Sequence, residues 1–150
     1  MQLSDHFTLD ELVHSDLASR KGIDNKPDAD LIPKLAEVSA HILEPVRQHF
    51  DIAFAPTSGY RCLELNRLLG SPDKSQHVKG EAVDFKIPGV DNFTVAEWIY
   101  QNLTYDQLIL ECYSPGQPCS GWVHCSFVVD NSRGQVLTFT GKEYLDGLIS

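Results

Sequence analysis

Apolar residues recur at helical spacing in the first third of the chain. One stripe consists of Leu9, Leu12, Val13 and Leu17, and a longer one of Leu31, Leu35, Val38, Ile42 and Val46. Steps of three and four residues place each stripe on one face of a helix. Thr8 and Glu11 have the spacing of a capping box before the first stripe, and we expect Gly22 to end that helix. Pro45 is expected to kink or shorten the second helix.

After Phe50 the pattern changes to short runs of strand-forming residues separated by turn residues. Strands are predicted over residues 52–57, 81–87, 106–111, 122–129 and 135–140, and short helices over 62–69 and 94–102. The polar residues 71–80 predict a loop. Because helices come first and strands follow, we predict an α+β fold whose N-terminal helices pack on a mainly antiparallel sheet. No linker divides the chain, so residues 1–150 are expected to form a single domain.

Composition and charge exclude several classes of partner. Hydrophobic residues make up 42% and charged residues 22% of the 150 residues, as in ordinary globular proteins. The net charge of −9 argues against nucleic acid as a partner, because phosphate binding needs clustered Lys and Arg. No apolar run is long enough for membrane insertion. The N-terminus lacks the basic start and apolar stretch of a secretory signal, so we expect the protein to be cytoplasmic at synthesis and to be exported, if at all, by something other than a cleaved leader. We also expect a monomer.

The four cysteines are too few for a disulfide scaffold. The favoured interpretation is four small, mostly buried free thiols. The alternative is a disulfide between Cys112 and Cys119, which flank a short loop containing proline and glycine, in an oxidising compartment.

Alternation in two predicted strands turns residues with metal-binding chemistry to one face. Asp84 in 81–87 and His124 in 122–129 both point away from the apolar residues of their strands. If the strands share a sheet, both stand on its open face, and the preceding loop can bring His77 to the same point. Two imidazoles and one carboxylate suit zinc and leave a fourth position open for water, as in catalytic sites. Each residue also has an ordinary alternative as a solvated or hydrogen-bonded side chain.

Several ordered motifs resemble one family. Residues 75–84, SQHVKGEAVD, resemble the S-x-H-x(6)-D motif of the M15 zinc peptidases, the D-alanyl-D-alanine carboxypeptidase group, and Trp122-Val123-His124 resembles their W-x-H element. Further similar segments are FTLDEL at 7–12, LEPVR at 43–47, TSGYR at 57–61 with Asn66, and DQLILE at 106–111. The resemblance covers about residues 5–130 and is closest to the single-domain subgroup of bacteriophages and prophages. It implies a hedgehog/DD-peptidase-like fold and Zn²⁺ held by His77, Asp84 and His124.

The resemblance implies a zinc-dependent peptidase that hydrolyses peptide bonds of bacterial peptidoglycan, as a D,D-carboxypeptidase or an endolysin-type endopeptidase. Many family members carry an acid three residues before the last histidine, where this chain has Gly121. We expect Glu111 to replace it as the proton-transferring residue; the alternative is a surface charge at a strand end. Arg61 is expected to hold a substrate carboxylate or an oxyanion; the alternative is an ion pair with Glu64 or Asp84.

Four further residues are expected to contact the substrate: Ser75, Tyr60, Gln76 and Trp122. The histidines of the helical half are assigned no chemistry, and Cys125 points away from the metal-binding face. Two other functions remain open. One is a catalytically reduced zinc-binding structural or wall-binding module of a phage particle, which Gly121 and the acidic charge favour. The other is a globular protein that binds no zinc.

Overall fold

The structure, a computed structural model, describes residues Met1–Ser150. Helix α1 (Leu9–Val13) begins with the expected capping box, because Thr8 Oγ1 accepts the Glu11 N–H and the Glu11 carboxylate accepts the Thr8 N–H. The first apolar stripe forms two helices rather than one, since Ser15 caps a new helix, α2 (Asp16–Lys21). Gly22 ends α2 in the left-handed conformation, as predicted.

A continuous helical segment carries the second apolar stripe. It consists of η1 (Ala29–Leu31), α3 (Ile32–Val38), the π-helical turn η2 (Ser39–Leu43) and α4 (Glu44–Phe50). Of the two effects expected of Pro45, a kink or a shortening, the shortening does not occur, because the segment continues to Phe50. The π-helical turn lies immediately before Pro45, and the Glu44 N–H bonds back to Ser39 there. The altered bonding accommodates a residue that has no N–H of its own.

Five strands form one sheet in the order β1-β3-β2-β4-β5. The strands are β1 (Ala82–Phe85), β2 (Gln107–Glu111), β3 (Trp122–Ser126), β4 (Gln135–Phe139) and β5 (Tyr144–Asp146). Only β2 and β4 pair in parallel; the other three pairs are antiparallel, which agrees with the predicted α+β class. Strand β5 was not expected, because three residues carry too little alternation to signal a strand.

The predicted strand at 52–57 is wrong. This segment has no ladder partner; an isolated bridge joins the neighbouring Ser58 to Asp84 of β1, and the Thr57 N–H donates to the Asp84 carbonyl. Its apolar residues Ile52 and Phe54 pack against the core without forming a strand. The prediction failed because a strand needs a partner, and residue pattern alone does not supply one.

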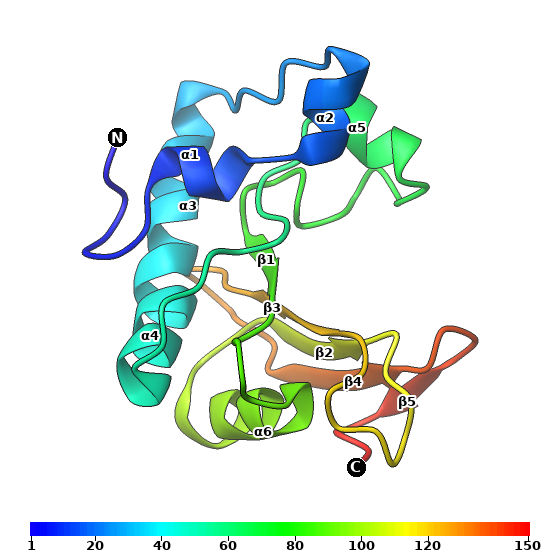
Figure 1. Cartoon of the computed structure of the whole chain (residues 1–150). Coiled ribbons are helices and arrows are strands. Elements are labelled where there is room, and N and C mark those ends of the chain that lie inside the picture. Colours follow the sequence, from blue (N-terminus) through cyan, green and yellow to red (C-terminus); the bar gives the residue numbers. More distant parts are fainter.

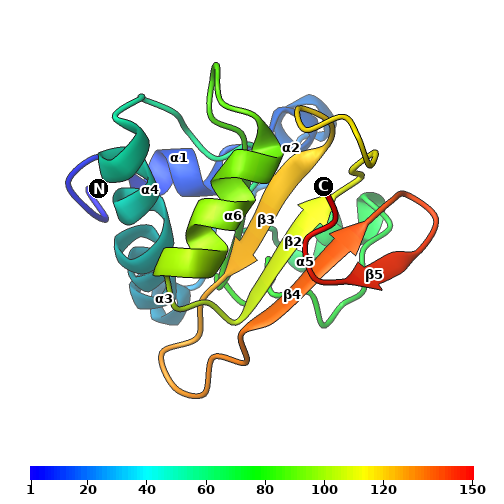
Figure 2. The same ribbon diagram turned by 90° about the horizontal axis from the view of Figure 1, so that it is seen from below.

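The sheet has one covered face and one open face. Helix α6 (Asn92–Asn102) packs on the covered face, and the α3–α4 segment stands beside the β1 edge (Figures 1 and 2). The shared core contains Val95, Ala96 and Ile99 of α6 with Val83, Phe85, Leu108, Leu110, Val123 and Cys125 of the strands. The opposite face of β1, β3 and β2 carries their polar side chains and faces the segment that includes α5 (Leu63–Leu68). None of the helices has the length and apolar character needed to span a membrane.

Candidate metal centre and cleft

Strand register places Asp84 beside His124. β1 and β3 are antiparallel, and Asp84 lies directly opposite His124 in the ladder. Directly opposite residues share one face of a sheet. Here His124 Nδ1 lies 2.9 Å from Asp84 Oδ1. The prediction that both side chains stand on the open face is therefore confirmed.

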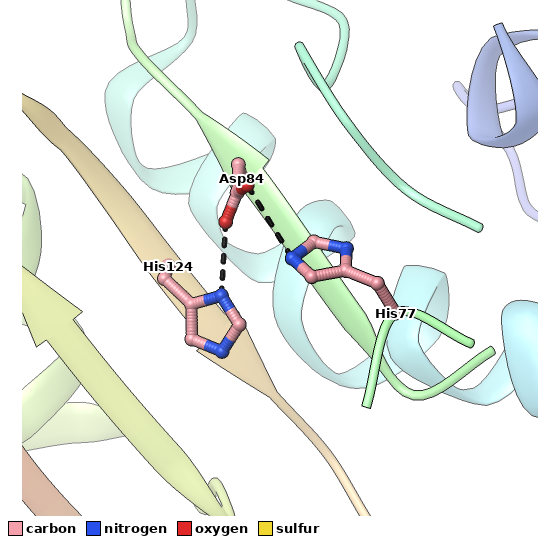
Figure 3. Close-up of side chains that lie close together, drawn as sticks. All are labelled: His77, Asp84 and His124. Atoms are coloured by element: carbon pink, nitrogen blue, oxygen red, sulfur yellow. Dashed lines mark hydrogen bonds and ion pairs between the residues drawn. The ribbon is translucent and has the colours of Figure 1, made fainter. Parts of the chain in front are cut away.

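The loop over residues 71–80 folds back and brings His77 to the same carboxylate. His77 Nε2 lies 3.3 Å from Asp84 Oδ2 (Figure 3). On the other side of the ring, Nδ1–H donates to the carbonyl oxygen of Gly59 at 2.7 Å. Because a carbonyl can only accept, this bond assigns the proton to Nδ1 and leaves the Nε2 lone pair facing Asp84.

The three side chains form a cluster that fits a metal ion. One donor atom from each of His77, Asp84 and His124 lies within 4.8 Å of the others, and all three residues are buried. Two imidazole nitrogens and a carboxylate oxygen are suitable ligands for zinc and related divalent metals.

The electrostatics of the cluster also favour a cation. The His77 lone pair and the Asp84 carboxylate repel each other unless a proton or a metal ion lies between them. Burial lowers the pKa of His77, despite the opposing effect of Asp84, so a proton is held weakly there. Burial alone would raise the pKa of Asp84, but the facing imidazoles lower it well below its usual range and keep the group ionised. A buried, ionised carboxylate beside two imidazole nitrogens is a donor set that a divalent cation would fit.

Arg61 reaches the same carboxylate from the turn before α5. Its Nη2 lies 3.2 Å from Asp84 Oδ2, its Nε donates to Ser58 Oγ, and its Nη1 donates to Asn66 Oδ1. The alternative of an ion pair with Asp84 is therefore present in the structure. Asn66 is fully buried and donates to the Pro72 carbonyl at 2.8 Å. It thereby ties Arg61 to the start of the loop that carries His77.

Glu111 lies on the face of the cluster at the end of β2. It pairs with Trp122, and Ile109 of the same strand pairs with His124. Two residues along a strand correspond to about 7 Å, which places the Glu111 backbone close to that of His124. Burial raises the pKa of Glu111; Asp84 adds to this effect, while His124 and Arg61 oppose it. The pairing of β2 with β3 thus brings His124 back next to Glu111.

Gly121 has a structural reason to be glycine. Its φ is +65°, and a Cβ at this position would collide with the carbonyl oxygen of Glu111. An L side chain is disfavoured by both facts. This backbone therefore leaves no room for an acidic side chain at position 121, where the resemblance places an acid.

The cluster opens into a cleft with a volume of about 1320 Å³. Arg61, Glu111, Ser75, Gln76 and Trp122 all line it. Ser75 Oγ also accepts the His77 N–H, and Gln76 Nε2 donates to Asp106 at 2.9 Å.

The expectation for Tyr60 is corrected by the structure. Tyr60 does not line the cleft; its side chain is 8% exposed and belongs to the hydrophobic core. Its backbone N–H donates to the Leu12 carbonyl at 2.7 Å, which holds this part of the turn against the helical half.

The cysteines are less buried than expected. All four are free thiols, and only Cys125 is buried, whereas Cys112 and Cys119 are exposed. The latter two flank the turn between β2 and β3. Cys125 faces the core, as strand alternation predicts, and burial raises the pKa of its thiol.

Three residues that support the cluster were missed in the sequence. Gly59 accepts the His77 ring N–H, and a Cβ there would collide with the Leu12 carbonyl. It lies inside the TSGYR segment, so a signal was present. Asp106 binds Gln76 and the guanidinium of Arg133, which lies 27 residues further along the chain. No local pattern pairs Asp106 with Arg133.

Comparison with known families and proteins gives one match. Residues 5–126 match the Peptidase M15 family, and no curated protein matches the chain. The match extends from the residues before α1 to the last residue of β3 and includes all three members of the cluster. The buried His–Asp–His cluster agrees with the metal dependence of these peptidases. The chain belongs to the Peptidase M15 family.

Proposed function

We propose that this protein is a zinc metallopeptidase that hydrolyses peptide bonds of bacterial peptidoglycan. The observation that carries the proposal is the convergence of His77, Asp84 and His124 at the wall of an open cleft. Structural zinc sites are closed by four protein ligands, whereas catalytic sites have three and leave room for water or substrate. Family membership supports peptide hydrolysis as the reaction.

Different residues of the cleft have different roles in hydrolysis. His77, Asp84 and His124 would hold the ion. When bound, zinc supplies Lewis-acid activation of a water molecule and of the scissile carbonyl. Glu111 accepts a proton from the attacking water and delivers it to the leaving amine. A carboxyl group whose pKa is raised by burial is suited to both transfers.

The remaining cleft residues position the ligands and the substrate. Arg61 orients Asp84 through their ion pair and lies where it can also bind a substrate carboxylate or stabilise an oxyanion. Ser75, Gln76 and Trp122 contact the peptide. The hedgehog/DD-peptidase-like form of the fold, a phage-type subgroup and the choice between D,D-carboxypeptidase and endolysin-type endopeptidase are parts of the same proposal.

A second function is a structural or wall-binding zinc module with little turnover. Gly121 favours it, because its backbone conformation leaves no room for an acid at that position. Glu111 favours the enzyme, because its half-buried carboxylate faces the cleft beside the cluster.

Metal analysis combined with a peptidoglycan digest tests the proposal. Purified protein should contain or take up about one equivalent of zinc, and mass spectrometry should show new amino termini or released D-alanine. His124→Ala should lose both properties. The matched control His14→Ala removes an exposed histidine and should retain both. Zinc at one equivalent with intact peptidoglycan would favour the structural module, and no stoichiometric zinc would exclude both functions.

A further inference from the structure

The cleft differs in charge from the rest of the molecule. Five of the 12 basic residues line it, but only four of the 21 acidic residues do. The basic residues are Lys34, Arg61, Lys74, Lys79 and Arg133, and the acidic residues are Glu81, Asp84, Asp106 and Glu111. The cleft therefore carries a small net positive charge in a chain whose net charge is −9.

The charges are separated along the strands. β2 begins next to Asp106 and ends at Glu111. At its beginning, Arg133 donates to Asp106 through Nη2 at 2.8 Å and through Nε. Gln76 binds the same carboxylate and so fixes the 71–80 loop at this end. The opposite end has the carboxylate of Glu111 among aromatic side chains of β3, β4 and β5.

Two lysines of the cleft, Lys34 and Lys79, lie next to the start of β1, and Lys74 lines the same cleft from the 71–80 loop. β1 and β2 both pair antiparallel with β3, so they start at the same end of the sheet. Lys34 of α3 lies 3.5 Å from Glu81, immediately before β1. Lys74 and Lys79 belong to the 71–80 loop, are exposed, and form no ion pair with an acidic side chain. We call Lys34, Lys74, Lys79 and Arg133 the basic end.

The basic end lies within reach of a peptide bound at the cluster. His124 pairs with Ile109, which is two residues from the first residue of β2. That separation is about 7 Å, or two residues of extended peptide. A substrate with its scissile bond at the cluster thus places a group two or three residues away beside the lysines.

We propose that the basic end is a subsite for a carboxylate group of the substrate, located two or three residues from the scissile bond. This inference rests on the proposed peptidase function and adds a substrate preference to it. Lys34 and Arg133 are held by acidic partners, so Lys74 and Lys79 supply the free positive charge. Peptides with a carboxylate at that distance are bound more tightly than the same peptides with a carboxamide.

The acidic remainder of the protein strengthens this preference. An anionic peptide is repelled by the net negative charge of the protein and attracted at the basic end. Charge complementarity of this kind selects both the ligand and its orientation. The carboxylate therefore points toward the start of β1 and β2, and the rest of the peptide extends past the cluster toward Glu111.

Matched synthetic peptides test the subsite. All contain the same cleavable bond; one has only a side-chain carboxylate, one only a C-terminal carboxylate, and one has both groups amidated. In the Lys74→Gln/Lys79→Gln variant, KM for the preferred carboxylate peptide should rise roughly two- to tenfold with kcat unchanged. The amidated peptide should show no change. The control Lys26→Gln/Lys142→Gln removes two exposed lysines outside the cleft and should behave as wild type.

The two carboxylate peptides show whether a side chain or a chain terminus occupies the subsite. High salt should abolish the preference, because exposed charges are screened. Equal KM values for carboxylate and amidated peptides in the wild type, or an equal rise for both in the variant, would overturn the subsite.

A binding experiment distinguishes failure of the proposed peptidase function from failure of the subsite. If the wild type cleaves none of the peptides, NMR titration of the purified protein with the same three peptides measures binding directly. Amide shifts at residues 74–79 that require a carboxylate and vanish in the double lysine variant support the subsite. Identical shifts with carboxylate and amidated peptides, or no shifts, overturn it.

Discussion

At the scale of single residues, the proposed chemistry depends on Glu111. Glutamine has nearly the same size and polarity but cannot accept a proton. We expect Glu111→Gln to lower kcat by about 10²- to 10⁴-fold, the usual contribution of a general acid–base group, and to leave zinc binding intact. Steady-state kinetics with metal analysis checks both effects. Glu97→Gln, an exposed position on α6, is the control. Unchanged kcat in Glu111→Gln would remove Glu111 from the mechanism.

The same substitution, which should lower kcat, should raise the stability of the metal-free protein. Burial raises the pKa of Glu111 above its ordinary value of 4.5. A group whose pKa is raised by folding stabilises the protein below its unfolded-state pKa, and this contribution is lost as the pH rises through the folded-state pKa. Metal-free Glu111→Gln should therefore be more stable than wild type near neutral pH, and the difference should shrink toward pH 4.5. Urea unfolding at several pH values measures it; a constant difference would contradict the electrostatic cause.

Gly121 gives a second test at single-residue scale. Gly116 has a similar positive φ but open space around its Cβ position, so Gly116→Ala should cost only about 1–2 kcal/mol of unfolding free energy. Gly121→Ala adds a collision with the Glu111 carbonyl and should cost about 2–5 kcal/mol. Gly121→Glu should lower activity rather than restore a family acid. Equal losses for the two alanine variants in urea unfolding would show that the collision is relieved at little cost.

Single-residue geometry was predictable where it follows from strand alternation. Asp84 and His124 share a face because each alternates with buried apolar neighbours, and that pattern is visible in the sequence. The contact between His77 Nδ1 and the Gly59 carbonyl was not predictable, because it depends on how two loops fold against each other. The position of His77 in the loop before the strand made a meeting with Asp84 and His124 possible, and the family resemblance made that expectation specific.

At the scale of elements, long periodic patterns predicted helices and strands well. The second apolar stripe forms one helical segment, and four predicted strands are present near their expected bounds. The errors arise where a tertiary partner decides the outcome. The segment 52–57 lacks a second strand, and β5 exists only because Tyr144 and its neighbours pair with β4.

Asp106 connects two elements of the cleft and can be tested at that level. Hydrogen bonds from Arg133 hold the pKa of Asp106 below its usual range despite burial, so its contribution is present near neutral pH and lost on acidification. We expect Asp106→Asn to cost about 1.5–3 kcal/mol of unfolding free energy and to speed amide exchange across residues 71–80. Asp130→Asn, an exposed aspartate after β3, is the control. Faster exchange near Arg133 alone would show that Asp106 does not hold the loop.

At the scale of the whole molecule, the chain divides into a helical support and a sheet that carries the chemistry. The family match ends at the last residue of β3, so β4 and β5 lie outside it. These strands nevertheless contribute Phe139 and Tyr144 to the cleft, and Arg133 lies just before them. The cluster thus belongs to the part shared with the family, whereas one wall of the cleft is built by the C-terminal strands.

Metal binding should stabilise the whole fold, because the cluster joins residues up to 47 positions apart (His77 to His124) from two strands and a loop. A ligand that binds only the folded state adds about 2.7 kcal/mol at a concentration 100 times its Kd. For a domain of this size, zinc should raise Tm by about 5–10 °C, and a chelator should reverse the shift.

The variant His77→Ala should abolish this rise in Tm. Cys112→Ser/Cys119→Ser should retain it, since thiols also bind zinc and these two are exposed. Thermal unfolding with and without zinc distinguishes the sites. A shift that survives in His77→Ala and disappears in the cysteine variant would assign the metal to the thiols and leave the cluster without its proposed role.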